Sequence, residues 1–177
     1  MNPSTILSIL FSLTLIFISH APLPASSLNL HQTVCSETSV EYNQKYDECV
    51  KALEVDPQIP SANTYVTLSK LIIEIAIKNS TGIQDYLKIL RSSDPSPAIN
   101  SCAIFDFTRI IQDFKSALAI VASSPQSASN EVSDAQSRWS QCGTSIQNEP
   151  KPHYELLPLI DHVLFFCQIL YKSISHI

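Results

Sequence analysis

The chain has 177 residues, with 16 acidic and 11 basic side chains and a formal net charge of −5. The Lys and Arg residues are scattered and form no basic cluster, so we do not expect a nucleic-acid-binding protein. Only two residues are glycine, which excludes a glycine-rich loop that holds a phosphate group.

The N-terminal residues have the layout of a secretory signal peptide. An apolar run from Ile6 to Ile18 precedes two prolines, Pro22 and Pro24, and then the small residues 25–27. The run is shorter than the roughly 20 residues that a membrane-spanning helix needs. We therefore predict a signal peptide over residues 1–27 and a secreted, soluble, extracellular domain over 28–177.

Prolines separate segments whose apolar residues recur with helical spacing. We expect a small helical segment over 28–56 and a helix bundle over 61–177. The expected helices of the bundle cover 61–79 with Ser61 as N-cap, a short stretch after Gly82, 98–122, a segment from Ser124-Pro125, and a segment from about Pro152.

Four long helices with short connections predict an all-α fold, an antiparallel up-and-down four-helix bundle with an N-terminal helical hairpin. Phe107, Phe114, Trp139 and Phe165 are expected in its packed core. The apolar stretch 156–170 is interrupted by a charged residue, so we do not expect it to span a membrane.

Five cysteines in a secreted domain predict two disulfides and one free thiol, although the count does not give the pairing. Cys35 and Cys49 both lie in the N-terminal segment. Cys102 lies near the start of one expected helix and Cys142 near the end of the next, where antiparallel neighbours meet. These positions favour Cys35–Cys49 and Cys102–Cys142, and Cys167 is expected as a buried, free thiol.

This cysteine spacing resembles that of the plant invertase and pectin methylesterase inhibitor family across the mature chain. The chain is most similar to the short stand-alone members, some of which are pollen allergens. The residues that match around the cysteines are Thr38, Tyr46, Leu53, Asp56-Pro57, Ser61-Ala62 and Ala135, with Phe107 where the family usually has Tyr. The resemblance implies two disulfides between consecutive cysteines, the first within the N-terminal hairpin and the second within a four-helix bundle.

The resemblance also implies a function, the inhibition of a plant cell-wall enzyme in the apoplast. Invertase inhibitors carry Pro-Lys-Phe at a helix start, where this chain reads Pro125-Gln126-Ser127, without the cation and the aromatic ring that would anchor the contact. We therefore expect a pectin methylesterase inhibitor that covers the substrate cleft, with acid invertase as the alternative target. We expect a monomer or a weak dimer.

Catalytic, cofactor and metal sites are not expected. Cys167 and His162 are five residues apart, whereas facing helical residues are three or four apart. His153 and His162, with Glu155 and Asp161, lack the compact spacing of a zinc site. A non-inhibitory helical ligand carrier remains the second alternative, and it would need a continuous internal pocket.

Asn79-Ser80-Thr81 is an N-glycosylation sequon. It lies before Gly82, where a helix is expected to end, so we expect Asn79 to be exposed and to carry a glycan.

Overall fold

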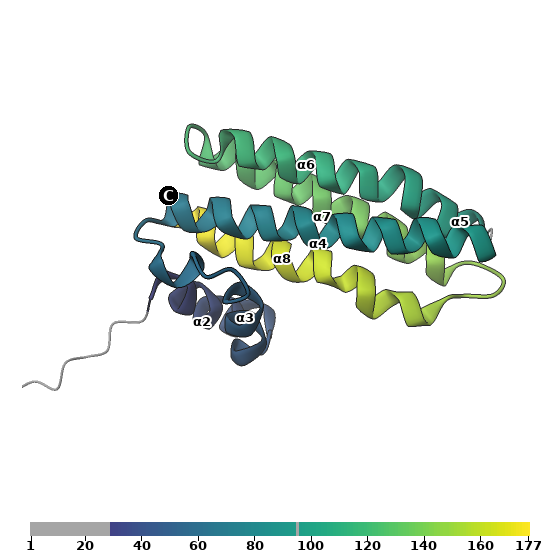
Figure 1. The fold of residues 1–177 in the computed structure, drawn as a ribbon, viewed down its shortest axis with the longest axis horizontal. Helices are drawn as coiled ribbons and strands as arrows, with labels where there is room; N and C mark the ends of the chain where they lie inside the picture. Colours follow the sequence, from purple (N-terminus) through teal and green to yellow (C-terminus); the bar gives the residue numbers. More distant parts are fainter. Residues whose placement is uncertain (1–28, 95) are drawn as a thin grey trace, which may run out of the picture.

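The computed structural model describes residues 29–94 and 96–177, so the predicted signal peptide over 1–27 lies outside the described residues. Every regular element in these ranges is helical (Figure 1), and two disulfides are present. The prediction of an all-α fold with two disulfides is confirmed. The elements are α2 (Leu30–Tyr42), α3 (Tyr46–Leu53), η1 (Ile59–Ser61), α4 (Tyr65–Ser93), α5 (Pro97–Ser101), η2 (Cys102–Asp106), α6 (Phe107–Ile120), α7 (Pro125–Gln147), η3 (Tyr154–Leu156) and α8 (Leu157–Ser175).

The four long helices α4, α6, α7 and α8 lie side by side, and each packs on two of the others (Figure 1). The packed pairs are α4–α6, α6–α7, α7–α8 and α8–α4, so the four helices form a closed ring, which we call the ring. The buried hydroxyls of Ser69 on α4 and Ser173 on α8 share a hydrogen bond of 2.7 Å. This bond joins the start of one helix to the end of the other, so α4 and α8 run antiparallel.

Helices α2 and α3 form a hairpin beside this ring. Asn43 ends α2 in the left-handed region, with φ 55°, a conformation that Asn tolerates better than most residues. Helix α2 packs along α8, where Glu37 pairs with His176 and Glu41 with Lys172. The Gln44 amide donates to the Phe165 carbonyl at 3.3 Å and to the Gln168 side chain. The hairpin is therefore seated on the C-terminal half of α8.

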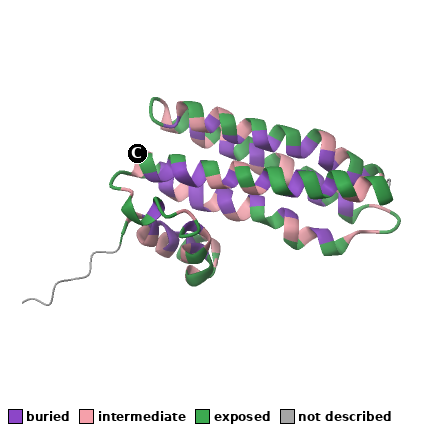
Figure 2. Ribbon diagram, in the orientation of Figure 1, coloured by how far each residue is buried: buried purple, intermediate pink, exposed green. Residues whose placement is uncertain are grey.

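The core lies inside the ring, where the apolar faces of the four helices meet (Figure 2). Phe107 and Phe114 are fully buried there, as expected. Trp139 and Phe165 are only half-buried at the edge of the core, so the prediction of core positions for them is wrong. The Trp139 indole N–H donates to Asp161 Oδ1 at 3.2 Å, and this bond holds the indole side chain at the surface.

Helix α4 is 29 residues long and continues through Gly82, so the predicted break at Gly82 is wrong. Ile83 and Leu87 are buried beyond it, and each contributes about 1.5–3 kcal/mol by burial. This gain exceeds the roughly 1 kcal/mol that a helical glycine costs relative to alanine. The helix starts at Thr64, whose hydroxyl accepts from the Thr67 N–H at 3.1 Å, whereas the expected N-cap, Ser61, ends η1.

The predicted helix over 98–122 is divided by a π-helical turn, η2. There the Phe107 N–H bonds to the Cys102 carbonyl, five residues back. The Gln84 amide on α4 donates to the Ala103 carbonyl at 2.9 Å and to the Thr108 hydroxyl at 2.8 Å. The wide π-helical turn disrupts the regular backbone hydrogen bonds of the helix. The Gln84 amide supplies a substitute donor to one of its carbonyls, that of Ala103.

Helix α8 is unusually apolar. The helical span Tyr154–Ser175, which includes η3, contains an 18-residue window with a mean hydropathy of 1.3, and by length and composition alone it could cross a membrane. In the fold 44% of this window is buried, and α8 packs on α2, α4 and α7. The apolar side chains of α8 therefore supply the core and the seat of the hairpin.

Gly82 offers a direct test of this account of α4. Within the described structure, an added Cβ at Gly82 would meet no other atom within 4 Å. We expect Gly82→Ala to raise the free energy of unfolding by about 0.5–1 kcal/mol, measured by urea denaturation. The matched control is Gly143→Ala, whose Cβ would make an ordinary contact of 3.6 Å with Ile160 Cδ1. A loss of stability at Gly82 alone would contradict a continuous α4.

Candidate functional site

The two disulfides connect elements that would otherwise separate. Cys35–Cys49 joins α2 to α3, with a Cα–Cα distance of 5.6 Å. Cys102–Cys142 joins the π-turn to the end of α7, with a Cα–Cα distance of 5.1 Å. All four residues are fully buried. The first disulfide closes a 14-residue separation and the second a 40-residue separation, so the second removes more entropy from the unfolded chain.

Cys167 is the one cysteine outside a disulfide in the described ranges, and it is buried in the core. Its thiol donates to the Val132 carbonyl at 3.7 Å. Burial raises the pKa of this thiol far above its ordinary value, which disfavours the reactive thiolate. His162, by contrast, is exposed on the outer face of α8. The arrangement does not offer Cys167 as a nucleophile.

The other charged groups that the sequence analysis weighed lie at separate places. His153 lies between Asp94, at 3.3 Å, and Glu155, at 3.0 Å, and so ties the end of α4 to η3. Cys102, Asp106 and Cys142 bring possible ligand atoms within 4.8 Å of one another. Their two sulfur atoms are bonded in a disulfide, so they do not provide the thiolates that zinc prefers.

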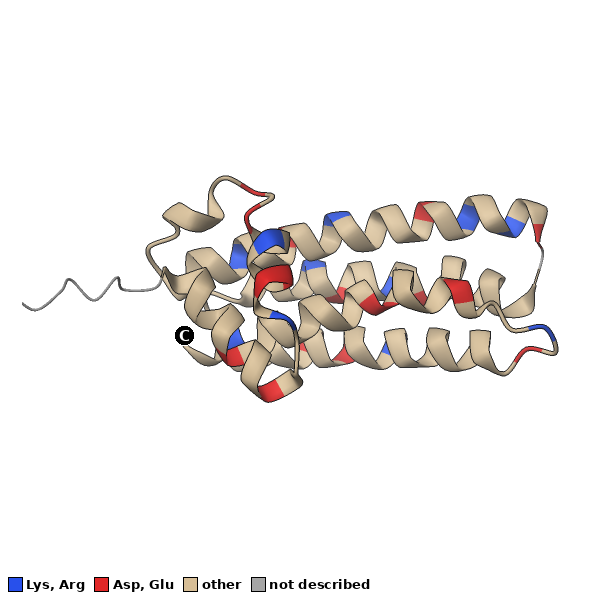
Figure 3. Ribbon diagram, turned by 90° about the horizontal axis from the view of Figure 1, so that it is seen from below, with Lys and Arg blue, Asp and Glu red and all other residues tan. Residues whose placement is uncertain are grey.

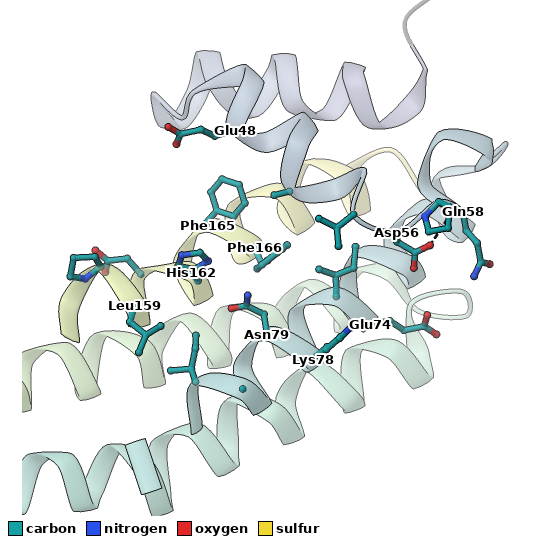
Figure 4. Close-up of a pocket in the computed structure, with 18 residues that line it drawn as sticks. Glu48, Asp56, Gln58, Glu74, Lys78, Asn79, Leu159, His162, Phe165 and Phe166 are labelled. Carbon is teal, nitrogen blue, oxygen red and sulfur yellow. Dashed lines mark hydrogen bonds between the residues drawn. The ribbon is translucent and has the colours of Figure 1, made fainter. Parts of the chain in front are cut away.

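A groove of about 1180 Å³ lies between the hairpin and the ring, and Figure 4 shows its lining. One wall is α3 with the loop that follows it, and the other walls are the outer faces of α4 and α8. No local sequence pattern predicts this groove, because its walls come from three separate segments. The apolar lining residues are Ala52, Val55, Pro57, Ile75, Gly82, Ile83, Pro158, Leu159, Phe165 and Phe166.

The groove exists because of how the hairpin is attached. Helix α2 packs on α8, and α3 packs mainly on α2. The buried His31 ring, 3.2 Å from the Glu54 carboxylate, holds the end of α3 against the start of α2. Val55, next to Glu54, is 76% exposed and lines the groove. The gap between α3 and the outer faces of α4 and α8 thus leaves apolar side chains open to solvent.

Acidic side chains outnumber basic ones around the groove. Glu48, Asp56, Glu74 and Asp161 line it, together with a single lysine, Lys78, and His162. Elsewhere on the helices the Lys and Arg residues lie among the Asp and Glu residues (Figure 3). The groove therefore combines an apolar floor with a rim of hydrogen-bond acceptors.

Asn79 lies inside the groove rather than at a helix end. It is in the interior of α4 and half-buried, so the prediction of an exposed helix end is wrong. The error follows from the predicted break at Gly82. Its side chain points into the groove (Figure 4), and its Oδ1 is buried without a hydrogen-bond partner in the described part of the chain.

Pro125-Gln126-Ser127 lies elsewhere, at the start of α7. Pro125 is the first residue of the helix, as expected, and the hydroxyls of Ser124 and Ser127 are 2.7 Å apart. Gln126 and Ser127 are exposed. These residues are at the loop between α6 and α7, on the side of the ring away from the hairpin (Figure 1).

Helices α6 and α7 carry a separate group of charged side chains around Asp113. Burial and the neighbouring carboxylates of Asp134 and Glu131 raise the pKa of Asp113 to about 6, against smaller opposite effects from Arg138 and Arg109. Asp113 Oδ2 is buried without a hydrogen-bond partner among the described residues. The folded protein therefore binds a proton here at a pH where the unfolded chain does not.

This raised pKa predicts how stability depends on pH. The charged Asp113 carboxylate destabilises the fold above pH 6, and this cost is removed as the pH falls from about 6 to 4. We expect Asp113→Asn to stabilise the protein at pH 7 by roughly 1–2 kcal/mol, allowing for solvent screening, and to have little effect at pH 4. Asp134→Asn, which removes one neighbouring charge, should give a smaller gain. Urea denaturation at both pH values measures this, and an equal effect at pH 4 and 7 would contradict it.

Compared with known proteins, the chain matches no protein-family model and no curated protein.

Proposed function

We propose that the chain is a secreted, non-enzymatic inhibitor of a plant cell-wall carbohydrate-active enzyme. The target that we rank first is pectin methylesterase, whose cleft the helical domain would cover, and acid invertase is the alternative. We further propose that the ring of four long helices is the antiparallel up-and-down bundle of that inhibitor family.

The observation that carries this proposal is the position of the two disulfides in an all-helical chain. Consecutive cysteines pair, Cys35 with Cys49 inside the hairpin and Cys102 with Cys142 inside the ring. The resemblance implies this same arrangement. Disulfides favour an oxidising, extracellular compartment, which also agrees with the predicted signal peptide.

The position of Pro125-Gln126-Ser127, where invertase inhibitors carry Pro-Lys-Phe, bears on the choice of target. Gln126 and Ser127 are exposed at a helix start, so a Lys and a Phe there would reach a partner without entering the core. This chain lacks that cation and that aromatic ring, which are typical anchors of a tight interface. The missing anchor is the reason to rank pectin methylesterase above invertase.

Titration of purified residues 28–177 against both enzymes at mildly acidic pH tests the proposal. We expect stoichiometric loss of pectin methylesterase activity and unchanged invertase activity. Loss of invertase activity alone would reverse the ranking of the two targets. If neither enzyme is inhibited, the inhibitor function is wrong for these targets.

A designed variant tests the family relationship separately. Gln126→Lys with Ser127→Phe restores the motif at an exposed position and should give a measurable gain of invertase inhibition. Gln126→Glu with Ser127→Ala is the matched control and should give no gain. If both variants fold, as judged by circular dichroism, and neither inhibits invertase, the proposed correspondence at residues 125–127 is wrong.

The groove favours a second candidate function, a carrier of an apolar ligand. Its volume of about 1180 Å³ is somewhat above the roughly 300–1,000 Å³ that is usual for ligand sites, so a small apolar ligand would fit. It is an open groove outside the ring, whereas the sequence analysis required an internal pocket between the helices. Saturable binding of a small apolar ligand at one site per molecule would support this function.

A further inference from the structure

We propose that Asn79 carries an N-linked glycan in the secreted protein, and that its first sugars lie in the groove and cover the apolar floor. The inference rests on the secretion that is part of the proposed function, and it is independent of which enzyme is inhibited. It connects the sequon, the groove and the unpartnered amide oxygen of Asn79.

The position of Asn79 within the groove is the first argument. The α4 residues that line the groove form one stripe, in which Ile75 and Ile83 lie one turn before and one turn after Asn79. The hydrogen bond between Ser69 and Ser173 fixes the antiparallel register of α4 and α8. Ten residues on from Ser69 and ten residues back from Ser173, this register sets Asn79 opposite Val163, and His162 and Phe166 on the same stretch of α8 line the groove.

The chemistry of the lining is the second argument. A sugar ring has an apolar C–H face and a rim of hydroxyl groups. The half-buried side chains of Phe165 and Leu159 offer apolar surface to the first, and Glu48 and Glu74, which also line the groove, supply hydrogen-bond acceptors at its rim for the second. A sugar on Asn79 also brings donors close to its buried Oδ1, which has no partner among the described residues.

The timing of the modification follows from the fold. Ser80 is 1% exposed, so the folded sequon is not an accessible substrate, and transfer must precede folding. Transfer joins Asn79 Nδ2 to C1 of the first sugar of a polyprenyl-diphosphate-linked oligosaccharide. The bond from C1 to the diphosphate breaks, its electron pair leaves with the polyprenyl diphosphate, and Nδ2 releases one proton to the solvent. Helix α4 then forms with the sugar already attached, on the side of the groove.

Thr81 provides the matched variants for the test. Its side chain is exposed, and within residues 29–94 and 96–177 its hydroxyl donates only to the Ile77 carbonyl of the same helix, at 2.8 Å. Thr81→Ala removes the sequon and leaves Asn79 in place, and Thr81→Ser keeps the sequon. Neither substitution changes the groove itself, because Thr81 is not one of its lining residues.

The experiment is secretion of the full chain from a plant cell culture, followed by glycopeptide mass analysis. A second preparation replaces residues 1–27 with the host's own signal sequence, so that a failure of the predicted signal peptide is distinguished from a failure of glycosylation. We expect a glycan on Asn79 in the unmodified chain and in Thr81→Ser, and none in Thr81→Ala. An unmodified Asn79 in protein secreted with the host signal would overturn the proposal.

Two further readouts test whether the glycan lies in the groove. Release by a peptide N-glycosidase should be about tenfold slower from native than from denatured protein, because the first sugar is covered. Binding of the neutral apolar dye Nile red should be strong for Thr81→Ala and weak for the glycosylated protein. Equal release rates together with equal dye binding would show a glycan in solvent and would overturn its placement in the groove.

Discussion

The contact between α2 and α8 determines where the rest of the N-terminal segment lies. Glu37 pairs with His176 and Glu41 with Lys172, so the two helices are joined at successive turns. Such partly exposed polar contacts contribute little individually, and the burial of Val34 and Cys35 on α2 adds apolar stabilisation of the hairpin. Helix α3 is joined to α2 by the Cys35–Cys49 disulfide and packs mainly on α2, and it forms one wall of the groove.

The two disulfides act on different parts of this arrangement. Cys35–Cys49 constrains a hairpin that is too small to bury a core of its own. Cys102–Cys142 fixes the π-turn against α7 at the end of the ring. An inhibitor must present one rigid face, and a carrier must keep one shaped site, so both proposed functions need these constraints. The groove adds a surface whose state depends on whether Asn79 is modified.

The sequence predicted the helical class because its apolar residues recur with a period near 3.6 and its glycines are few. It did not predict that α4 passes Gly82, since local propensity is weaker than the burial of Ile83 and Leu87. The π-turn was missed because Ala103, inside it, and Phe107, directly after it, keep helical spacing. The groove depends on how α2 seats on α8, which is a tertiary contact without a local sequence signal. The mistaken helix end also misplaced Asn79.

Hydrogen–deuterium exchange on Cys35→Ser with Cys49→Ser most directly tests the claim that the hairpin is a separate unit seated on α8. The account predicts faster exchange in 29–61 and in the groove-facing part of α8, with α6 and α7 unchanged from the unmodified protein. Faster exchange spread equally over α6 and α7 would contradict it, because the hairpin would then be an integral part of the ring. Unchanged exchange in α3 would contradict the claim that the disulfide holds this wall of the groove.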